Sequence, residues 1–568
     1  MARRDVNALL IGGGIASASA AAELRAQGFD GSILLATREQ DAPYHRPPIT
    51  KGYLQGRESR EEASVHPPPW YAENEIELLT RSSVNALDPQ NRTATIGKEE
   101  VRFKQALVAT GAMVRRLRVD GAQLEGIHYL RAFGNADLLR RNAEDAEHVV
   151  IVGGSYIATE VAASLAALDK RSTLIMQEDV TLERTFGVRA GHYVQELLEA
   201  HGVRVLSGQS VVRFEGDGGG EEARVAAVIT DGDARVPADL VVVGVGAVPD
   251  VALARRGGLE VGKSGGVACD ERLRTSAADI FAAGDICEYD SRLHGRRMRI
   301  EHEEVAAAQG RTAARQMMGQ AEPFAEVPYF WSDLSDWATL EYVGPATRWE
   351  EEIHCGAPSD GAFTVWYVNA GRLCAALTVG RPEHLELARA LIRGRIELAP
   401  HRAMLADPGA DLDAISGSLR PTCFAYPGKD LSAGVLRRGE WAGRTKLLHQ
   451  IAPTERKSMY ARVTFVQVTP EHVEDSARLF EESVVPAARQ EEGFRGAMLL
   501  VRESGEGMAI DLADSLEHLR ANEQSGFYQS QVAKFRDKIV GHPRREIFRV
   551  AVSKGVRGGI DLLEGSGD

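Results

Sequence analysis

The chain has 568 residues, of which 44% are hydrophobic and 26% are charged, and these ordinary proportions exclude a mainly disordered or fibrous protein. At about 100 to 200 residues per domain, this length predicts about three to five domains. Lysine and arginine number 67 against 81 for aspartate and glutamate, giving a formal net charge of −14. This charge argues against a protein that binds nucleic acid by neutralising its phosphates.

The cysteines and the apolar stretches indicate the cellular setting. No C-x-x-C pair occurs, so the sequence predicts no zinc ribbon, disulfide framework or metal site. The first strand begins by Ala8, which leaves no room for a signal peptide, and no apolar stretch resembles a membrane span. We therefore expect a cytoplasmic protein that does not bind membranes. The cysteines are Cys269, Cys287, Cys355, Cys374 and Cys423.

A glycine turn follows the first apolar run. Residues 8–11 are too few for a helix and lead directly into Gly12-Gly13-Gly14, which predicts a buried parallel strand followed by a helix to about Ala26. In G-x-G-x-x-S, Gly12 permits a tight turn and Gly14 lets the backbone approach a pyrophosphate, while Ser17 must allow close helix packing. Alone, this motif also fits any strand–turn–helix unit of an α/β protein.

The same arrangement returns at residues 149–160, where V-V-I-V precedes G-G-S-Y-I-A-T-E, 141 residues after the first turn. Two such units predict two dinucleotide sites. Ser155 and Ala158 stand where the second and third glycines are usual, so the pyrophosphate approach is expected to be tighter here.

The ends of the second strands indicate how the ribose is bound. An acid there binds ribose hydroxyls, whereas a basic residue suggests a 2′-phosphate. The first unit offers Arg38-Glu39 and the second Gln177-Glu178. Because Arg38 replaces the expected acid, we expect ribose binding in the first unit to shift to Glu39.

Three further buried strands end in glycine, at Leu107–Ala112, Val241–Gly246 and Ile280–Asp285. The order G-x-G-x-x-S, A-T-G-A, G-G-S-Y-I-A-T-E, G-V-G-A-V-P, I-F-A-A-G-D resembles the pyridine nucleotide-disulfide oxidoreductase superfamily. In that superfamily one site holds FAD and the other NAD(P)H. The segment Tyr44–Lys51, Y-H-R-P-P-I-T-K, is similar to Y-x-R-P-P-L-S-K of ferredoxin, putidaredoxin and rubredoxin reductases and of apoptosis-inducing-factor-like proteins.

Further landmarks of that group are matched by Glu301-His302, Gln309-Gly310 and residues 327–333, so the resemblance covers about residues 5 to 400. It implies an α/β protein with two Rossmann-like dinucleotide-binding domains, for FAD and NAD, and an α+β interface domain. The domain boundaries we expect are 1–115 and 241–325 for FAD, 116–240 for NAD(P)H, and 326–404 for the interface domain.

The resemblance also assigns site residues. Lys51 and Glu160 resemble a family pair that meets beside the flavin, where a buried charge needs a partner and a cation stabilises the reduced ring. We take these two and Trp331, whose alternative is core packing, as catalytic. FAD is expected to be held by Gly12, Gly14, Arg46, Lys51, Thr110, Gly111 and Asp285. The NAD(P)H site is expected to contain Gly153, Ser155 and Glu160. Further expected cofactor-binding residues are Ile15, Ala16, Glu39, Tyr156, Ile157, Glu178, Gly246, Gly284, Glu301, His302 and Trp331.

Several of these residues have plainer alternatives. Asp285 is alternatively a helix N-cap, and Glu178 a solvated loop charge. Glu178 resembles the acid that faces the adenosine ribose in monodehydroascorbate reductases, so we expect NADH rather than NADPH, although Arg184 can still contact a 2′-phosphate. Glu303 stands where the family often has tryptophan after the histidine, so nicotinamide stacking is expected to differ.

The electron acceptor follows from what the chain lacks. Dithiol reductases of the family carry C-x-x-x-x-C on the helix after the FAD strand, but no cysteine precedes Cys269, so disulfide reduction is not expected. Electrons are expected to leave for an iron-sulfur or haem partner, for oxygen or for an organic substrate. A run of arginines offers a local patch for an acidic ferredoxin, or simply a solvated loop. These are Arg292, Arg296, Arg297 and Arg299.

The last third is the unusual part. Residues 362–400 predict a hairpin and a helix near Glu383–Arg393, which resembles the family's interface domain, and residues 405–457 predict a linker that contains Cys423. From residue 458 to 553 the pattern predicts a βαββαβ, ferredoxin-like α+β domain, before a flexible tail at 554–568. Its strands are expected at 460–468, 496–502, 507–513 and 545–552, and its helices at 470–488 and 516–538.

Residues 493–496 and 526–528 are similar to antibiotic-biosynthesis-monooxygenase-like domains, which pair as dimeric α/β barrels. The resemblance implies a homodimer, and it leaves open whether the domain is catalytic or only dimerises. The isolated His472, His518 and His542 are expected to be structural or exposed.

Three functions follow. The first is an NADH-dependent FAD reductase that passes electrons to a ferredoxin or Rieske-type partner of an oxygenase or cytochrome P450. The second is a self-contained flavin oxidoreductase or monooxygenase that acts on a small organic substrate with the C-terminal barrel domain. The third is a redox-sensing interaction protein similar to apoptosis-inducing factor.

Overall fold

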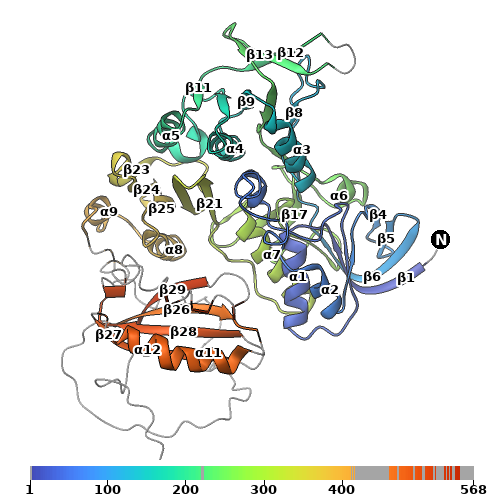
Figure 1. The fold of residues 1–568 in the computed structure, drawn as a ribbon. Helices are drawn as coiled ribbons and strands as arrows, with labels where there is room; N and C mark the ends of the chain where they lie inside the picture. The colour runs from blue at the N-terminus through green and yellow to red at the C-terminus, as the bar shows by residue number, and fades with distance from the viewer. Residues whose placement is uncertain are drawn as a thin grey trace, which may run out of the picture. The chain divides into compact units, whose positions relative to one another are not determined.

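The computed structural model describes residues 3–218, 223–410, 412 and 415 and, with short gaps, 459–550. The chain separates into two compact units, residues 1–428 and 429–568, whose elements are labelled in Figure 1. Within the described residues, no helix is both long and apolar enough to cross a membrane.

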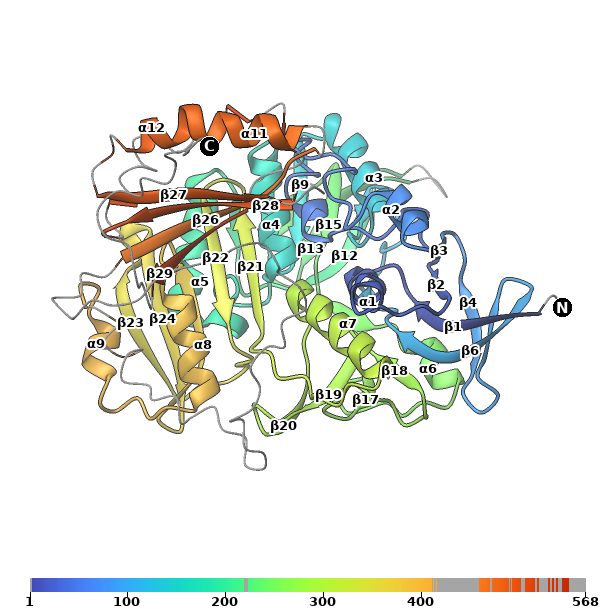
Figure 2. The same ribbon diagram turned by 90° about the horizontal axis from the view of Figure 1, so that it is seen from below.

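The first sheet of the larger unit has the strand order β3-β2-β1-β6-β5-β4, and β18 pairs with β6. Strands β3, β2, β1, β6 and β18 run parallel. Most of their apolar residues are buried, because helices cover the sheet. Helices α1 and α7 lie side by side (Figure 2). The strands are β1 (Arg3–Ile11), β2 (Ile33–Ala36), β3 (Ile76–Leu79), β4 (Val84–Asp88), β5 (Thr93–Ile96), β6 (Glu99–Val108) and β18 (Ile280–Ala282), and the helices are α1 (Ile15–Ala26), α2 (Pro68–Glu73), α6 (Ala252–Arg256) and α7 (Glu303–Met317).

The α1–α7 contact depends on small residues. A Cβ at Gly310 would lie 2.1 Å from the carbonyl oxygen of Ala16, so the two helices touch through backbone. Ser17, at the last position of the first glycine motif, is fully buried. This agrees with the close helix packing expected from the sequence.

The second sheet is entirely parallel, in the order β11-β10-β9-β15-β8. The predicted strand and helix of the second glycine unit are present as β9 and α4. The elements are β8 (Ile127–His128), β9 (His148–Val152), β10 (Arg171–Ile175), β11 (Arg204–Leu206), β15 (Leu240–Val243), α3 (Phe133–Glu144), α4 (Tyr156–Ala166) and α5 (Glu183–Ala200).

Smaller sheets accompany these two parallel sheets in the larger unit. They are β7 (Ala112–Val114) with β16 (Ala247–Pro249), the antiparallel β12 (Val211–Gly216), β13 (Val225–Thr230) and β14 (Arg235–Pro237), and β17 (Val267–Cys269) with β19 (Cys287–Ser291) and β20 (Arg296–Arg299).

An antiparallel sheet in the order β21-β22-β25-β24-β23 follows, and α8 packs on it. The predicted hairpin and helix are present as β24–β25 and α8. Leu405 and Ile415 are buried in the same apolar cluster, so packed structure continues past residue 404; most of the predicted linker lies outside the described residues. The elements are β21 (Tyr329–Leu334), β22 (Ala338–Val343), β23 (Glu351–Ala357), β24 (Ala362–Asn369), β25 (Arg372–Val379), α8 (His384–Gly394) and α9 (Arg402–Ala406).

The C-terminal unit contains an antiparallel sheet in the order β27-β28-β26-β29. In this order the first and third strands of the βαββαβ pattern lie at the centre, as in a ferredoxin-like unit. The predicted helix 516–538 lies mostly outside the described residues, and Cys423, His542 and the tail lie wholly outside them. The elements are β26 (Met459–Gln467), α11 (Val473–Leu479), a π-helical turn (Phe480–Val484), α12 (Val485–Ala488), β27 (Phe494–Val501), β28 (Glu506–Ala513) and β29 (Arg544–Val550).

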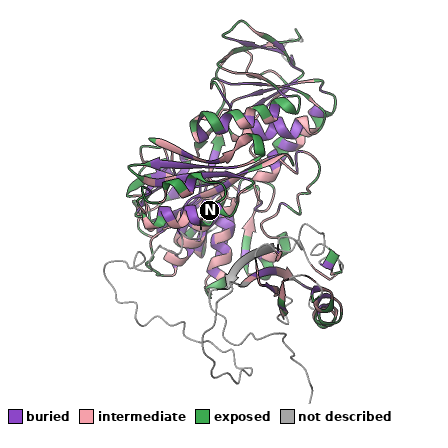
Figure 3. Ribbon diagram, turned by 90° about the vertical axis from the view of Figure 1, so that its left-hand side faces the viewer, coloured by how far each residue is buried: buried purple, intermediate pink, exposed green. Residues whose placement is uncertain are grey.

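Burial follows the layers. Buried residues occupy the strands and the inner sides of the helices, whereas exposed residues lie on the outer helix faces and turns (Figure 3).

Candidate cofactor and active site

A cavity of about 590 Å³ begins at the first glycine turn and reaches β21. It contains residues from both nucleotide units and from the interface sheet. Every predicted site residue lines it except Gly153, Ser155 and Glu178. The cavity therefore gathers residues that lie far apart in the sequence.

One end of the cavity is built to receive an anion. Gly12 has a φ of +121° and a Cβ there would lie 2.1 Å from the oxygen of Ala109, so only glycine fits this turn. At Gly14, by contrast, a Cβ would meet no atom within 4 Å. Helix α1 starts at Ile15 with no side-chain cap and no acid in its first turn. The open space and free N–H groups fit a pyrophosphate.

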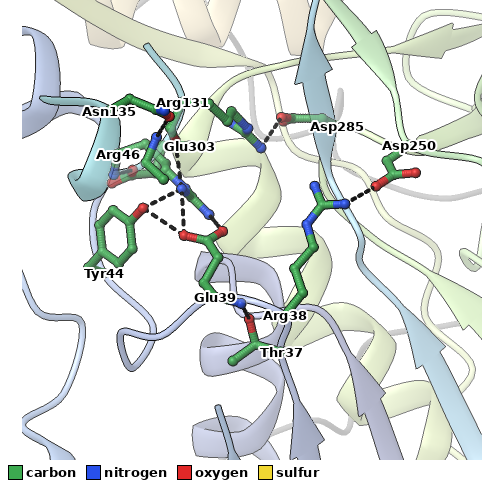
Figure 4. Close-up of polar contacts among 11 residues, drawn as sticks. Thr37, Arg38, Glu39, Tyr44, Arg46, Arg131, Asn135, Asp250, Asp285 and Glu303 are labelled. Carbon is green, nitrogen blue, oxygen red and sulfur yellow. Dashed lines mark hydrogen bonds and ion pairs between the residues drawn. The ribbon is translucent and has the colours of Figure 1, made fainter. Parts of the chain in front are cut away.

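Arg46 also lines the cavity and bonds to several neighbouring residues (Figure 4). Its guanidinium forms an ion pair with Glu39 and donates to the hydroxyl of Tyr44 and, at 2.7 Å, to the carbonyl of Arg131. Burial acts to raise the pKa of Glu39, but the charge of Arg46, the hydrogen bonds from Arg46 and Tyr44 and the charge of Arg131 together hold this pKa below its usual value. Glu39 therefore serves as the partner of Arg46.

A second half-buried cation, Arg131, lies 3.7 Å from Asp285. Burial raises the pKa of Asp285, and the charge of Arg131 opposes this shift. Burial and the neighbouring Arg46 lower the pKa of Arg131, so this arginine adds positive charge at an energetic cost, which a bound anion would reduce. Sequence reasoning missed Arg131; its only signal is a cation shortly after the strand at Ile127–His128.

At the other end of the cavity, Lys51 is the centre of a cluster of polar side chains. Its Nζ lies 3.4 Å from Glu160 Oε1 and 3.0 Å from Asp333 Oδ2. Glu160 also accepts hydrogen bonds of 2.6 Å from the hydroxyls of Thr50 and Ser332. Burial raises the pKa of Glu160, and Lys51 and the two hydroxyls oppose the shift. Sequence reasoning did not assign a role to Asp333, although this residue ends the family landmark at residues 327–333.

Two rings of the cavity wall lie next to this cluster. Lys51 Nζ is 5.6 Å from the centroid of the half-buried Trp331 ring, within the range of a cation–π contact. His302 packs 4.4 Å from Phe330, and its Nδ1 is buried without a hydrogen-bond partner among the residues described here. Burial lowers the pKa of His302 to about 3, so the ring is neutral at ordinary pH. Such an orphaned polar atom fits a cavity that holds a polar cofactor.

Glu303, which stands where the family often has tryptophan, holds the backbone of Arg46 in place. Its carboxylate accepts the backbone N–H of Arg46 at 2.9 Å and pairs with His45 Nδ1 at 2.7 Å. This hydrogen bond raises the pKa of His45. An aromatic ring at position 303 would leave both groups without these contacts.

The three remaining predicted residues surround the second glycine turn. A Cβ at Gly153 would lie 2.3 Å from the oxygen of Gly244, and Ser155 stands at the start of α4 without capping it through its side chain. Glu178 lies against this turn and pairs with Arg184 at 3.1 Å. Helix α4 then carries Tyr156 and Glu160 into the cavity, so it links the two nucleotide turns.

The arginine run is largely neutralised by neighbouring acids. Arg292 lies 3.3 Å from Glu271, Arg297 lies 2.8 Å from Asp290, and Arg299 pairs with Glu301. Arg296 donates to the carbonyl of Pro345 at 2.8 Å.

Comparison with known proteins shows the family of this chain. Residues 6–310 match the model of the pyridine nucleotide-disulphide oxidoreductases. The chain belongs to this family. Residues 329–416 match a second model, the reductase C-terminal domain. The predicted family, the fold class and the assignment as an FAD-dependent oxidoreductase are thereby confirmed.

Relatives and solved structures agree. The chain is 33% identical over 410 residues to a probable ferredoxin reductase, CtmF, of Castellaniella defragrans, covering 72% of this chain and 98% of the relative. It is 30% identical over 413 residues to the putidaredoxin reductase CamA of Pseudomonas putida, covering 72% and 96%. The crystal structure of a covalent putidaredoxin reductase–putidaredoxin complex matches with a TM-score of 0.69 and 30% identity, covering 73% of this chain and 99% of that chain.

The C-terminal unit extends beyond the length shared with these relatives. Its likeness to antibiotic-biosynthesis-monooxygenase-like domains stays a prediction.

Proposed function

We propose that this oxidoreductase takes electrons from NADH through FAD and passes them to a small iron-sulfur protein that serves an oxygenase or a cytochrome P450. The observation that carries the proposal is the single cavity that joins an uncapped helix N-terminus to the Lys51–Glu160 pair. The names of its relatives support an iron-sulfur protein or similar small electron carrier as the acceptor, since these relatives are ferredoxin, putidaredoxin and rubredoxin–NAD(+) reductases.

FAD, when bound, supplies the chemistry by taking up two electrons as a hydride and releasing them one at a time. The chain's own residues bind and orient it. Gly14 and the N-terminus of α1 would receive the pyrophosphate, and Asp285 would accept hydrogen bonds from ribityl hydroxyls. Lys51, held between Glu160 and Asp333, would place a positive charge beside the ring system.

The cavity wall also supports a one-electron acceptor. None of the described residues that line it is a cysteine, so the wall offers no thiol to relay electrons to a disulfide. For the nicotinamide nucleotide we propose NADH, because Glu178 lies against the second glycine turn and already neutralises Arg184. An acid in this place accepts ribose hydroxyls and repels a 2′-phosphate.

Steady-state turnover tests the proposal. NADH oxidation by the full chain is followed with cytochrome c as the final acceptor, with and without an added [2Fe–2S] ferredoxin. We expect the rate to rise at least about tenfold with ferredoxin, and to be lower with NADPH. An unchanged rate on adding several ferredoxins contradicts the proposed partner.

A second candidate function rests on the C-terminal unit. A cavity of about 70 Å³ there is mostly apolar, yet it contains the buried Arg462–Asp511 ion pair at 3.0 Å. The hydroxyl of Ser476 lines it and is buried without a hydrogen-bond partner among the described residues. These polar groups would orient a small organic substrate, which would make the chain a self-contained oxidoreductase. The cavity is smaller than the roughly 300 to 1,000 Å³ of usual ligand pockets, so this candidate requires the cavity to widen on binding.

This candidate has its own test. A panel of aromatic compounds is screened for stimulation of NADH oxidation without ferredoxin, in the wild type and in Ser476→Trp, which fills the cavity. Stimulation that the variant loses supports the second function. Glu482→Trp, on an exposed position of the same helical segment, is the matched control. If no compound stimulates the wild type, the second function loses its support.

We also infer a cytoplasmic homodimer. Met498 and Leu500 alternate on the edge strand β27 and are 39% and 49% exposed, which is unusual for an unpaired apolar edge. Sedimentation is expected to give a dimer for the wild type and a monomer for the double variant Met498→Lys, Leu500→Lys. A monomeric wild type contradicts the dimer.

A further inference from the structure

An arginine–aspartate pair lies at the edge of the main cavity, on the side of the first nucleotide unit. Arg38, after β2, donates to Asp250 Oδ2 at 2.8 Å, and both residues line the cavity (Figure 4). The Arg38 side chain is 52% exposed and that of Asp250 is 14% exposed. The aspartate is thus the buried partner and the arginine reaches it from the rim.

Arg38 stands where dinucleotide sites of this kind usually have the acid that binds the ribose. The acid next to it, Glu39, is already engaged, because its two carboxylate oxygens bind the half-buried Arg46 and the hydroxyl of Tyr44. Turning Glu39 toward a ribose would leave Arg46 without its partner, at a high cost in free energy.

Asp250 is held rigidly at the place left open. Its carbonyl accepts the hydroxyl hydrogen of Thr110 at 2.7 Å, and its N–H donates to the carbonyl of Gly111 at 2.9 Å. These contacts fix its backbone to the turn after β6, beside Gly12 and opposite the end of β2. A carboxylate fixed in this way accepts hydrogen bonds without paying for its own ordering.

We propose that Asp250 is the acceptor for the adenosine ribose hydroxyls of FAD in this chain, and that Arg38 positions it. The usual acid has moved across the cavity, from the end of β2 to the residue after β16. The hydrogen bond from Arg38 holds the Asp250 carboxylate along the rim of the cavity. Because this contact also neutralises Arg38, the arginine offers no free cation to a 2′-phosphate. The inference rests on the FAD binding that the proposed function requires.

Binding, not turnover, tests this inference. Apoprotein of the full chain is titrated with FAD and, separately, with FMN, which lacks the adenosine, and flavin fluorescence gives the two dissociation constants. Asp250→Ala is expected to weaken FAD binding about 10- to 100-fold, the usual loss for a hydrogen bond to a charged group. FMN affinity is expected to stay within about twofold of the wild type.

Two further variants make the result specific. Asp290→Ala breaks a similar arginine–aspartate pair, with Arg297, outside the cavity, and should leave both affinities unchanged. Arg38→Asp combined with Asp250→Asn returns an acid to the end of β2 and should recover at least about half of the lost binding free energy.

The outcomes separate the two claims. If the wild-type apoprotein binds no FAD, the proposed function fails. If the wild type binds FAD and Asp250→Ala binds it equally well, or loses FMN affinity to the same extent, the role of Asp250 is overturned.

Discussion

The ammonium group of Lys51 lies 3.4 Å from the carboxylate of Glu160, although the first belongs to the first nucleotide unit and the second to helix α4 of the other. This contact joins the two halves of the cavity at a buried ion pair. A buried pair is sensitive to the loss of either partner, because the remaining charge is left uncompensated.

Lys51→Ala should therefore slow reduction of the flavin by NADH by about tenfold or more while FAD is retained, because the cation near the ring is lost. Anaerobic stopped-flow absorbance measures the rate, and the bound flavin spectrum reports FAD content. Lys51→Arg, which keeps the charge, should recover part of the rate. Lys170→Ala is the control, because it removes a half-buried lysine that bonds to backbone carbonyls and does not line the cavity. An unchanged rate in Lys51→Ala contradicts the role of Lys51.

The Glu160 carboxyl predicts a dependence of stability on pH. Burial raises its pKa above the usual value of 4.5, so the folded protein binds its proton more tightly than the unfolded chain does. Its contribution to the free energy of unfolding is complete below about pH 4.5 and is lost as the pH rises through the raised pKa. Melting temperatures between pH 4.5 and 8 should fall less steeply in Glu160→Gln than in the wild type; parallel curves would contradict this.

His302 predicts the opposite slope. Its pKa is about 3 in the folded protein, against an ordinary value of 6.5 for histidine, so the unfolded chain binds its proton more tightly. The free energy of unfolding should then decrease by about 1.4 kcal/mol for each pH unit below 6.5. In denaturant titrations at pH 4.5 to 6.5, the free energy of unfolding of His302→Phe should change less with pH, by the contribution of one proton. His192→Gln, at an exposed histidine, should keep the pH dependence of the wild type. A slope that His302→Phe leaves unaltered contradicts the buried neutral ring.

Two glycines separate folding from cofactor binding. A Cβ at Gly14 meets no atom within 4 Å, whereas a Cβ at Gly310 would lie 2.1 Å from the oxygen of Ala16. Gly14→Ala should leave the melting temperature of the apoprotein within about 1 °C but weaken FAD binding by about tenfold or more, because the methyl enters the pyrophosphate space. Gly310→Ala should lower the apoprotein melting temperature by several degrees. Full FAD affinity in Gly14→Ala would place the pyrophosphate elsewhere.

The sequence predicted local structure best at positions where the backbone conformation accepts one residue type alone. The turns at Gly12 and Gly153 have φ values of +121° and +124°, which few residues but glycine adopt, so the motif reveals strand, turn and helix together. The hairpin predicted within residues 362–400 is likewise present as β24 and β25. Both signals are local, and the family resemblance then placed them in order.

The partners of charged residues were not predictable in the same way. Arg131 and Asp250 acquire their roles from contacts between segments far apart in the chain, namely Arg131 with Asp285 and Arg38 with Asp250. No local period encodes such a contact. The arginine run at 292–299 shows the reverse case, since a cationic stretch in the sequence is paired with acids in the fold.

The most direct test of the account is a double-mixing stopped-flow experiment without oxygen. The yellow protein is first bleached with one equivalent of NADH and then mixed with an oxidised [2Fe–2S] ferredoxin, while the flavin and ferredoxin absorbance bands are followed together. We expect fast bleaching by NADH and then flavin reoxidation in step with reduction of two equivalents of ferredoxin. A flavin that is bleached but stays reduced in the presence of ferredoxin would contradict it.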